Sequence, residues 1–577
     1  MTPRSVPRNP WPALLVLCLG NFLILLDTSI VNTAAPDMMR SLGIGVDEIL
    51  WVLNGYLLAL AALLMVFGRL GDLLGPRPVF VGGLVLFTLA SFGCGVAPSA
   101  GPLVAARVLQ GVGAAALLPQ ALTLIAGILP AERRGLGFGV FTAVAGVAAV
   151  SGPTVGGMIV TDAGWRWVFH LNVPLGVLGV LLALRFVPDL RTDRPRSFDP
   201  VGVLLATLGL TGVVYGLVEG GRHHWGRIAG PVTIPTLLVA SLAALVLFVR
   251  WERRHPEPLV PLELFRDRGF ALGTVITLVT AFALHGFLLV FVIETQTLLG
   301  MTPLESGLAA LPWTVTLSAV APVAGRLTDR VGGRVLLVVG LAAYALGVLG
   351  VAVAPTPTSA AAVLVVPLIG IGIGMGASIA PTTTEAMRAV APARAGAASG
   401  VLTTARQVGA ALGAAVVGVV LQDQLAASLR RTAEQQAAQL PAAARSRFVD
   451  GFARAADRGL QLGSGQHGGV RAPADLPSGL AQRFDHLVAL TFRQGFLPAA
   501  RPTLGVVAAV LALGSLLAVW MPRRGPAGAR EAGRATSGDT ASGGPTPVTE
   551  GPAVTAAAGR AAGAVQPTGT QHERGCG

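Results

Sequence analysis

The chain alternates long apolar runs with short polar connections. Each run has the length of about 20 residues that a helix needs to cross a bilayer. Their even number puts both chain ends on one side of the membrane. The pattern predicts an all-α polytopic membrane protein with fourteen transmembrane helices. The runs cover residues 13–34, 49–68, 79–97, 102–126, 138–160, 168–187, 200–218, 232–250, 271–293, 305–326, 334–354, 361–387, 397–422 and 500–521.

Arginine is distributed unevenly among the connections. About 20 arginines lie before the first run and in alternate connections, whereas the six short connections opposite hold about four. Such a bias marks the cytoplasmic side of a membrane protein. It predicts two cytoplasmic termini and a multi-pass protein of the bacterial inner membrane. The arginines of the opposite side are Arg40, Arg166, Arg222 and Arg227.

Composition agrees with a lipid environment. The chain is 53% hydrophobic and 12% charged, whereas soluble domains carry about 25% charged residues. The net charge of +13 comes from arginines spread over loops and a tail, which argues against nucleic-acid binding. Because the chain has no lysine, it has no Gly-x-x-x-x-Gly-Lys-Ser/Thr motif for ATP. Its three cysteines lack metal-binding spacing.

A charged, glycine-rich turn occurs twice, at residues 68–77 and 325–334, with six identical positions in register. The copies follow the second and the tenth runs, whereas two six-helix bundles alone would separate them by six runs. Two helices inserted between the bundles account for the difference. The predicted parts are a cytoplasmic N-terminus (1–12), a six-helix bundle (13–187), a linker with two inserted helices (188–270), a second six-helix bundle (271–521) and a disordered cytoplasmic tail (522–577).

The second bundle contains a long external connection, residues 423–499. Within it, Leu425–Arg458 alternates Ala and Leu with Arg, Glu and Gln in a helix-compatible way. The segment could cap the external mouth, lie on the membrane surface or form a variable loop. The sequence leaves these three possibilities open.

Four motifs resemble those of the major facilitator superfamily. The turn at 68–77 resembles its signature Gly-x-Leu-Ala-Asp-Arg-x-Gly-Arg. Residues 26–36 are similar to the Leu-Asp-x-Thr-Ile-Val-Asn-x-Ala-x-Pro motif of its fourteen-helix drug:proton antiporter branch, the EmrB/QacA-like group. Residues 107–113 and 151–157 are similar to its Arg-x-x-Gln-Gly and antiporter motifs. The resemblance implies the major facilitator fold, with two six-helix bundles plus two inserted helices, and multidrug efflux.

Two charged residues are predicted inside spans. Asp27 lies about 20 Å from the cytoplasmic end of its helix, and Arg107 about 7–8 Å below the external face. A lone charge at such depth is costly and normally finds a partner. We expect the two to face each other, with Asp27 as the group at which proton arrival and cationic drug departure compete. The alternative is a fixed structural ion pair.

The resemblance also implies gating and coupling residues. Asp72 is expected to bind the positive start of the thirteenth helix near Ser399 and Gly400, although Leu73 and Pro76 replace the family's basic residues. The antiporter motif implies a hinge that prevents proton leak, with ordinary close packing as the alternative. Its residues are Gly146, Gly152, Pro153, Gly156 and Gly157. The gating turns comprise Gly68, Asp72, Gly75, Arg77, Gly325, Asp329, Arg330, Gly332 and Arg334.

Further polar and aromatic residues in the spans are candidates for a substrate cavity. His285 is either a proton relay or a packing residue, and Glu219 and Glu294 are expected to be solvated at external span ends. The cavity candidates are Asn32, Asn54, Tyr56, Gln110, Trp313, Arg406 and Gln407. For Arg406 the alternative is a position near enough to the cytoplasm for its side chain to snorkel there.

These features predict a transporter rather than an enzyme. The expected function is proton-coupled efflux of hydrophobic drug-like or antibiotic molecules, cationic ones included, by alternating access. Its partners are the lipid bilayer, protons and the substrate; a functional monomer without cofactor or metal is expected, with the proton gradient as energy source. Export of a self-made secondary metabolite or metabolite uptake are alternatives on the same fold. A non-transporting membrane sensor is the alternative from another class.

Overall fold

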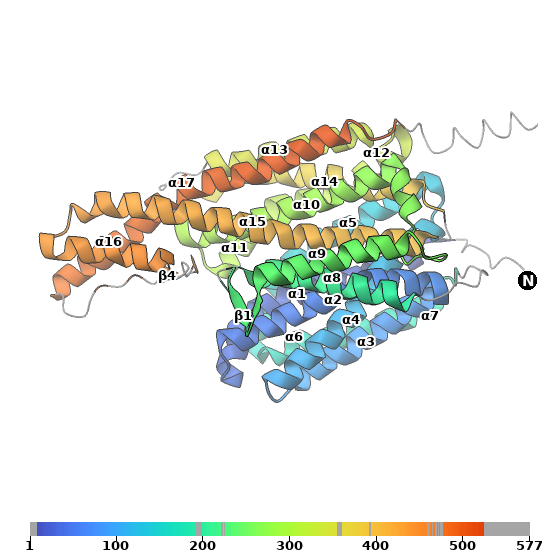
Figure 1. The fold of residues 1–577 in the computed structure, drawn as a ribbon, viewed down its shortest axis with the longest axis horizontal. Coiled ribbons are helices and arrows are strands. Elements are labelled where there is room, and N and C mark those ends of the chain that lie inside the picture. Colours follow the sequence, from blue (N-terminus) through green and yellow to red (C-terminus); the bar gives the residue numbers. More distant parts are fainter. Residues whose placement is uncertain are drawn as a thin grey trace, which may run out of the picture. The chain divides into compact units, whose positions relative to one another are not determined.

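The computed structural model describes residues 9–523, except for 191–198, 221–222, 224, 355–360, 392–393, 458–461, 464–465, 468–469, 471 and 473–476. The described part is nearly all helical, as predicted (Figure 1). Most of the predicted N-terminal segment 1–12 and of the predicted tail 522–577 lies outside it. Within the described residues, the strands form two small hairpins, β1 (Arg227–Ala229) with β2 (Val232–Thr233) and β3 (Leu462–Gly463) with β4 (Gln466–His467).

Each predicted run coincides with one or two helices, although α1, α15 and α17 extend well beyond their runs. The N-terminal helices are α1 (Trp11–Leu42), α2 (Val46–Leu74), α3 (Pro76–Val96), α4 (Ala100–Ile128), α5 (Arg134–Ala163), α6 (Arg166–His170) and α7 (Asn172–Phe186). The inserted pair is α8 (Pro200–Gly220) and α9 (Ile234–Glu252). The C-terminal helices are α10 (Arg268–Ile293), α11 (Pro303–Ala309), α12 (Leu311–Val331), α13 (Arg334–Val353), α14 (Val365–Arg388), α15 (Ala395–Ala437), α16 (Ala442–Asp457) and α17 (Ser478–Ala518).

Twelve helices in the described residues are long and apolar enough to cross a membrane. Helices α5 and α12 are not among them, although they contain 30 and 21 residues. In α12 the last turns carry three charges, which lower its hydropathy. These two helices pack directly against each other, and each belongs to a different half of the chain.

Both copies of the repeated turn depend on a glycine. Gly75, between α2 and α3, has a φ of 94°, and Gly332, between α12 and α13, has a φ of 85°. Residues with a β-carbon avoid this backbone region. The two glycines therefore permit the same sharp helix-to-helix turn in both halves, and we call the side of the molecule that carries them the turn side.

The external connection is a packed helical extension, which differs from a variable loop. α15 continues to Ala437, α16 follows it, and α17 begins at Ser478, 22 residues before the predicted start of the last span. Phe448, Phe452 and Phe484 are almost fully buried and pack edge to face. Their cluster is continuous with the core of the C-terminal helices. Figure 1 shows α16 beside the end of α15.

The inserted helices α8 and α9 pack against each other, and α8 also contacts α2 and α15. A small apolar cluster joins the three helices through Ala61, Val214 and Ala411. The inserted pair therefore lies along a line where the N-terminal and C-terminal helices meet, rather than within either core.

Candidate functional site

The predicted pair of Asp27 and Arg107 forms a direct salt bridge. Arg107 Nη1 lies 2.6 Å from Asp27 Oδ2. Both side chains are buried, with 0% of Asp27 and 1% of Arg107 exposed. Because α1 and α4 supply one partner each, the pair connects two helices through opposite charges in an apolar interior.

Amides complete the hydrogen bonding of the Asp27 carboxylate. Its Oδ1 accepts hydrogen bonds from Gln110 Nε2 at 2.8 Å and from Asn172 Nδ2 at 3.0 Å. Asn172 begins α7, so three helices converge on one carboxylate. The sequence pointed to Gln110 as a cavity residue and assigned no role to Asn172. Its place as a polar residue inside the apolar run 168–187 was the available signal.

Arg107 has contacts besides Asp27. Its Nε donates to the Val52 carbonyl at 3.2 Å, and its Nη1 donates to Gln110 Oε1 at 2.7 Å. The guanidinium carbon lies 4.3 Å from the centroid of the Tyr56 ring, a cation–π distance. Tyr56, predicted to line a cavity, is fully buried against this charge. Arg107 is therefore held in place even when one Asp27 contact changes.

The repeated turns bridge the two halves of the chain at the turn side. Asp72 accepts hydrogen bonds from the backbone amides of Gly396 and Ala397, at 2.9 and 3.0 Å. These amides lie in the first turn of α15, where unpaired N–H groups and the helix dipole favour an anion. The contact is three residues nearer the helix start than the sequence indicated. Ser399 instead lies 3.0 Å from Thr123 of α4, hydroxyl to hydroxyl.

Asp329 makes the mirrored contact from the other half. Its two oxygens accept the backbone amides of Gly135 and Leu136, at 2.9 and 3.1 Å. These amides lie in the first turn of α5. Each half of the chain therefore binds the start of a helix from the other half, and in both cases the aspartate at the equivalent position of the repeated turn makes the contact.

Close backbone approach accompanies both contacts. A β-carbon on Gly325 would lie 2.0 Å from the Gly135 carbonyl oxygen, and one on Gly68 would lie 2.7 Å from that of Gly396. Higher on α5, a β-carbon on Gly146 would lie 2.4 Å from Ser318 Oγ of α12. At such distances no side chain fits, so the two halves are in direct contact at the turn side.

The known proteins that this chain resembles agree on one family. The family model described as Major Facilitator Superfamily matches residues 17–414. The chain belongs to the major facilitator superfamily. It is therefore a multi-pass membrane transporter of small molecules, as the sequence motifs implied. This match identifies the superfamily and does not distinguish its fourteen-helix branch.

Several characterised members of the superfamily are similar along most of this chain. "Multidrug resistance protein Stp" of Mycobacterium tuberculosis is 38% identical over 73% of this chain and 78% of its own length. "Tetracenomycin C resistance and export protein" of Streptomyces glaucescens is 34% identical over 74% of this chain and 78% of its own. The solved structure of the proton:xylose symporter XylE has a TM-score of 0.56 at 13% identity, over 89% of this chain and 96% of that chain. This last likeness shows the superfamily fold alone.

The antiporter motif divides between two neighbours. Gly146 faces α12, whereas Gly152 and Gly156 face α1, where β-carbons would lie 2.1 Å from Ser29 Oγ and 2.5 Å from Ile30 Cγ1. Gly157 has no atom within 4 Å of such a β-carbon. The side chain of Pro153 lies outside the described residues. Tight packing thus accounts for three of the glycines.

Other residues of the turns differ between the copies. Arg77 Nη2 donates to the Leu184 carbonyl of α7, whereas Arg330 is exposed and Arg334 is half-buried. Arg69 is buried, 3.8 Å from Glu257 in the segment after α9, while its counterpart Arg326 is exposed. The first copy of the turn has fewer basic residues than the second. Its arginines nevertheless make more contacts with the rest of the protein.

The remaining candidates occupy varied positions. Asn54 donates to Glu219 Oε1 of α8 at 2.8 Å, and Trp313 packs edge to face on Phe287. Asn32 is exposed and donates to the Thr28 carbonyl of its own helix. Arg406 and Gln407 are half-buried in α15, and the exposed ring of His285 contacts the Ala281 carbonyl.

The acidic residues Glu219 and Glu294 are buried, contrary to the expected solvation. Glu219 has a partner in Asn54 across a helix contact. Glu294 begins a π-helical turn, Glu294–Leu298, that turns its side chain into the protein. Hydropathy does not reveal such a turn.

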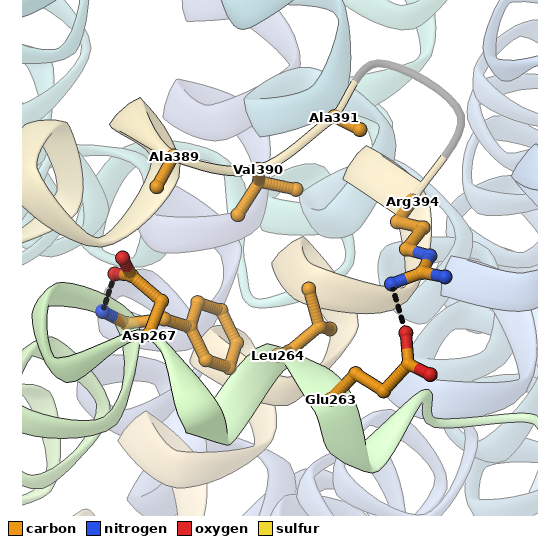
Figure 2. A pocket seen from close by; sticks show the side chains of 8 residues that line it. Glu263, Leu264, Asp267, Ala389, Val390, Ala391 and Arg394 are labelled. Carbon is orange, nitrogen blue, oxygen red and sulfur yellow. Dashed lines mark hydrogen bonds and ion pairs between the residues drawn. The ribbon is translucent and has the colours of Figure 1, made fainter.

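A small pocket of about 140 Å³ lies beside the start of α15 (Figure 2). A short 3-10 helix, Leu262–Arg266, forms one wall and residues 389–391 form the other. The side chains of Glu263 and Arg394, both exposed in part, border it and form a salt bridge of 2.7 Å. This ion pair connects the segment after the inserted helices to α15, next to the amides that Asp72 binds.

Proposed function

We propose that this chain is a proton-coupled exporter of hydrophobic, drug-like or antibiotic molecules across the bacterial inner membrane. In this proposal α5 and α12 also cross the membrane, which gives the fourteen spans of the drug:proton antiporter branch and cytoplasmic termini. The printed activities of the relatives support export, since they include multidrug resistance and tetracenomycin C export. The protein acts as a monomer without a cofactor.

The observation that carries proton coupling is the buried carboxylate of Asp27. It accepts three hydrogen bonds, from Arg107, Gln110 and Asn172. A proton on one oxygen would remove the negative charge that Arg107 faces and one acceptor from the network. The contacts of α1 with α4 and α7 would then weaken together, while Arg107 keeps Val52 and Gln110 as acceptors.

The contacts at the turn side support alternating access. Asp72 and Asp329 join the halves there, so the described arrangement is closed on the proposed cytoplasmic side. Protonation of Asp27 and breaking of the contacts of Asp72 and Asp329 would therefore occur at different stages of the transport cycle.

The test compares Asp27→Asn with Asp162→Asn, which neutralises an exposed carboxylate at the end of α5. Ethidium efflux is measured in cells that express each variant, with and without a proton gradient. We expect Asp27→Asn to abolish the gradient-dependent part and Asp162→Asn to retain it. Full gradient-driven efflux by Asp27→Asn, with normal expression, contradicts the proposal.

A second candidate is export of a metabolite that the host cell makes itself. The printed names of the tetracenomycin C protein and of a probable actinorhodin transporter favour it, the latter at 35% identity over 76% of this chain. Deleting the gene and measuring the host's secreted products tests this candidate. Unchanged secretion together with lost drug resistance favours general efflux.

A further inference from the structure

In the part of the chain that the structure describes, Arg406 of α15 has no hydrogen-bond or ion-pair partner, and it lies inside a candidate membrane span. Arg406 is eleven residues from the start of α15 at Ala395, or about 17 Å along the axis. Its side chain is half-buried. Within the described residues, the hydrogen bonds and ion pairs do not include its guanidinium. An intramembrane cation of this kind is costly unless something neutralises it.

The neighbours of α15 define the direction in which Arg406 points. Gly413 contacts the Phe282 carbonyl of α10, and Ser399 contacts Thr123 of α4. Residues seven apart lie on one face of a helix, so Ser399, Arg406 and Gly413 share a face. Ala411, which packs toward α2 and α8, lies about 140° around the helix from Arg406. Arg406 therefore faces the region between the N-terminal and C-terminal halves.

The buried carboxylates in and beside the described spans have partners elsewhere. Asp27 is bonded to Arg107, Glu219 to Asn54, and Glu385 to the Gly333 amide and Arg388. Glu252 accepts the Val260 amide, and Asp199 accepts the Gly202 amide and the Trp251 indole N–H. Asp329, which is buried, and Asp72, which is half-buried, bind helix starts on the turn side.

Glu294 is too far away to neutralise Arg406. On the shared face of α10 and α15, Leu278 meets Gly409 and Phe282 meets Gly413, a constant offset of 131 positions. This register places Glu294 level with Leu425. That level is about 28 Å beyond Arg406 along α15.

We propose that Arg406 binds the acidic group of the transported molecule, so that the substrates include hydrophobic organic anions. This inference rests on the proposed export function and adds the charge of its substrates. A carboxylate or phenolate oxygen would supply the missing counter-charge and accept charge-assisted hydrogen bonds from the guanidinium fork. The charges of Asp27 and Arg107 balance each other. Arg406 therefore remains as an unbalanced positive charge in the region between the two halves.

The test uses two probes of opposite charge, carboxyfluorescein as organic anion and ethidium as cation. Full-length protein in proteoliposomes is assayed for both, as wild type and as Arg406→Gln, Arg406→Lys and Arg430→Gln. Arg430 is the matched control, because it lies on the same helix, exposed and paired with Glu434. Equilibrium binding of carboxyfluorescein to the detergent-purified protein, by fluorescence anisotropy, provides a readout that needs no transport.

We expect Arg406→Gln to weaken carboxyfluorescein binding and transport at least about tenfold, the scale of one charge-assisted hydrogen bond. Ethidium transport should change less than about twofold, Arg406→Lys should be intermediate and Arg430→Gln should equal wild type. Equal loss of both probes indicates a structural role and overturns the inference. Wild-type protein that transports ethidium but does not bind carboxyfluorescein also overturns it, while export stands. If neither probe is transported but Arg406-dependent binding of the anion persists, the proposed export fails and the anion site stands.

Discussion

The carboxylate of Asp329 accepts a hydrogen bond of 2.9 Å from the backbone amide of Gly135, a residue 194 positions earlier in the chain. Asp72 makes the corresponding bond to Gly396, 324 positions later. The two contacts are related by the internal repeat, and each places an anion at the start of a helix from the opposite half. Both contacts must therefore break if the halves separate on the turn side.

Neutralising either aspartate should open the turn side. Asp329→Asn replaces one acceptor oxygen by an amide that faces a backbone N–H, which costs about 1.5–3 kcal/mol. The closed form should then lose about tenfold or more in population. Asp72→Asn should have a similar effect, and the double variant a larger one. Labelling of Ser318→Cys by a maleimide applied from the turn side measures the opening, because Ser318 contacts Ala143 of α5.

Asp162→Asn is the matched control for these substitutions, since Asp162 is exposed on the side away from the turns. Unchanged Ser318→Cys labelling in both Asp329→Asn and Asp72→Asn would refute the idea that the aspartates hold the halves together.

Close contact between α5 and α12 predicts that a single methyl group blocks closure. A β-carbon on Gly325 would lie 2.0 Å from the Gly135 carbonyl oxygen. Gly325→Ala should abolish ethidium efflux while the protein still inserts and folds. Gly82→Ala in α3 is the control, because its β-carbon would have nothing within 4 Å. Wild-type efflux by Gly325→Ala would show that the halves need not approach so closely.

The bond from Asn54 to Glu219 predicts a role in attaching the inserted helices. Asn54→Ala leaves a buried carboxylate oxygen without this donor, at a cost of about 1–3 kcal/mol. The melting temperature of the purified protein should fall by several degrees. Asn32→Ala should leave it unchanged, since Asn32 is exposed and donates only within its own helix. Equal melting of the two variants would argue against the attachment.

The helical extension beyond the spans should behave as a packed unit. Phe448 is fully buried between Phe452 and Phe484. Phe448→Ala should remove about 3–5 kcal/mol of packing free energy. Limited proteolysis should then cut between α15 and α17 much faster than in wild type, while Phe448→Leu should be intermediate. Equally fast cleavage of the wild-type protein would indicate a loop instead.

Much of the fold could be predicted because long apolar runs and arginine bias report directly on the membrane. The Asp27–Arg107 pair was predictable for the same reason, as two isolated charges in lipid must find partners. The start of α17 was missed, because polar residues and Pro498 interrupt its hydropathy although the backbone stays helical. The contact of Asp329 with α5 was also missed, because it depends on how the halves approach and not on any local pattern.

Helix α15 joins three of these features in one continuous element. Its first turn binds Asp72, Arg406 lies eleven residues from its start, and its far end packs with α16. At 43 residues it is about 65 Å long, so a tilt of about 10° at one end displaces the other by about 11 Å. Helix α15 can therefore transmit a tilt from one of its ends to the other. An antibody fragment bound to the extension would report on, or arrest, the contact of the first turn of α15 with Asp72.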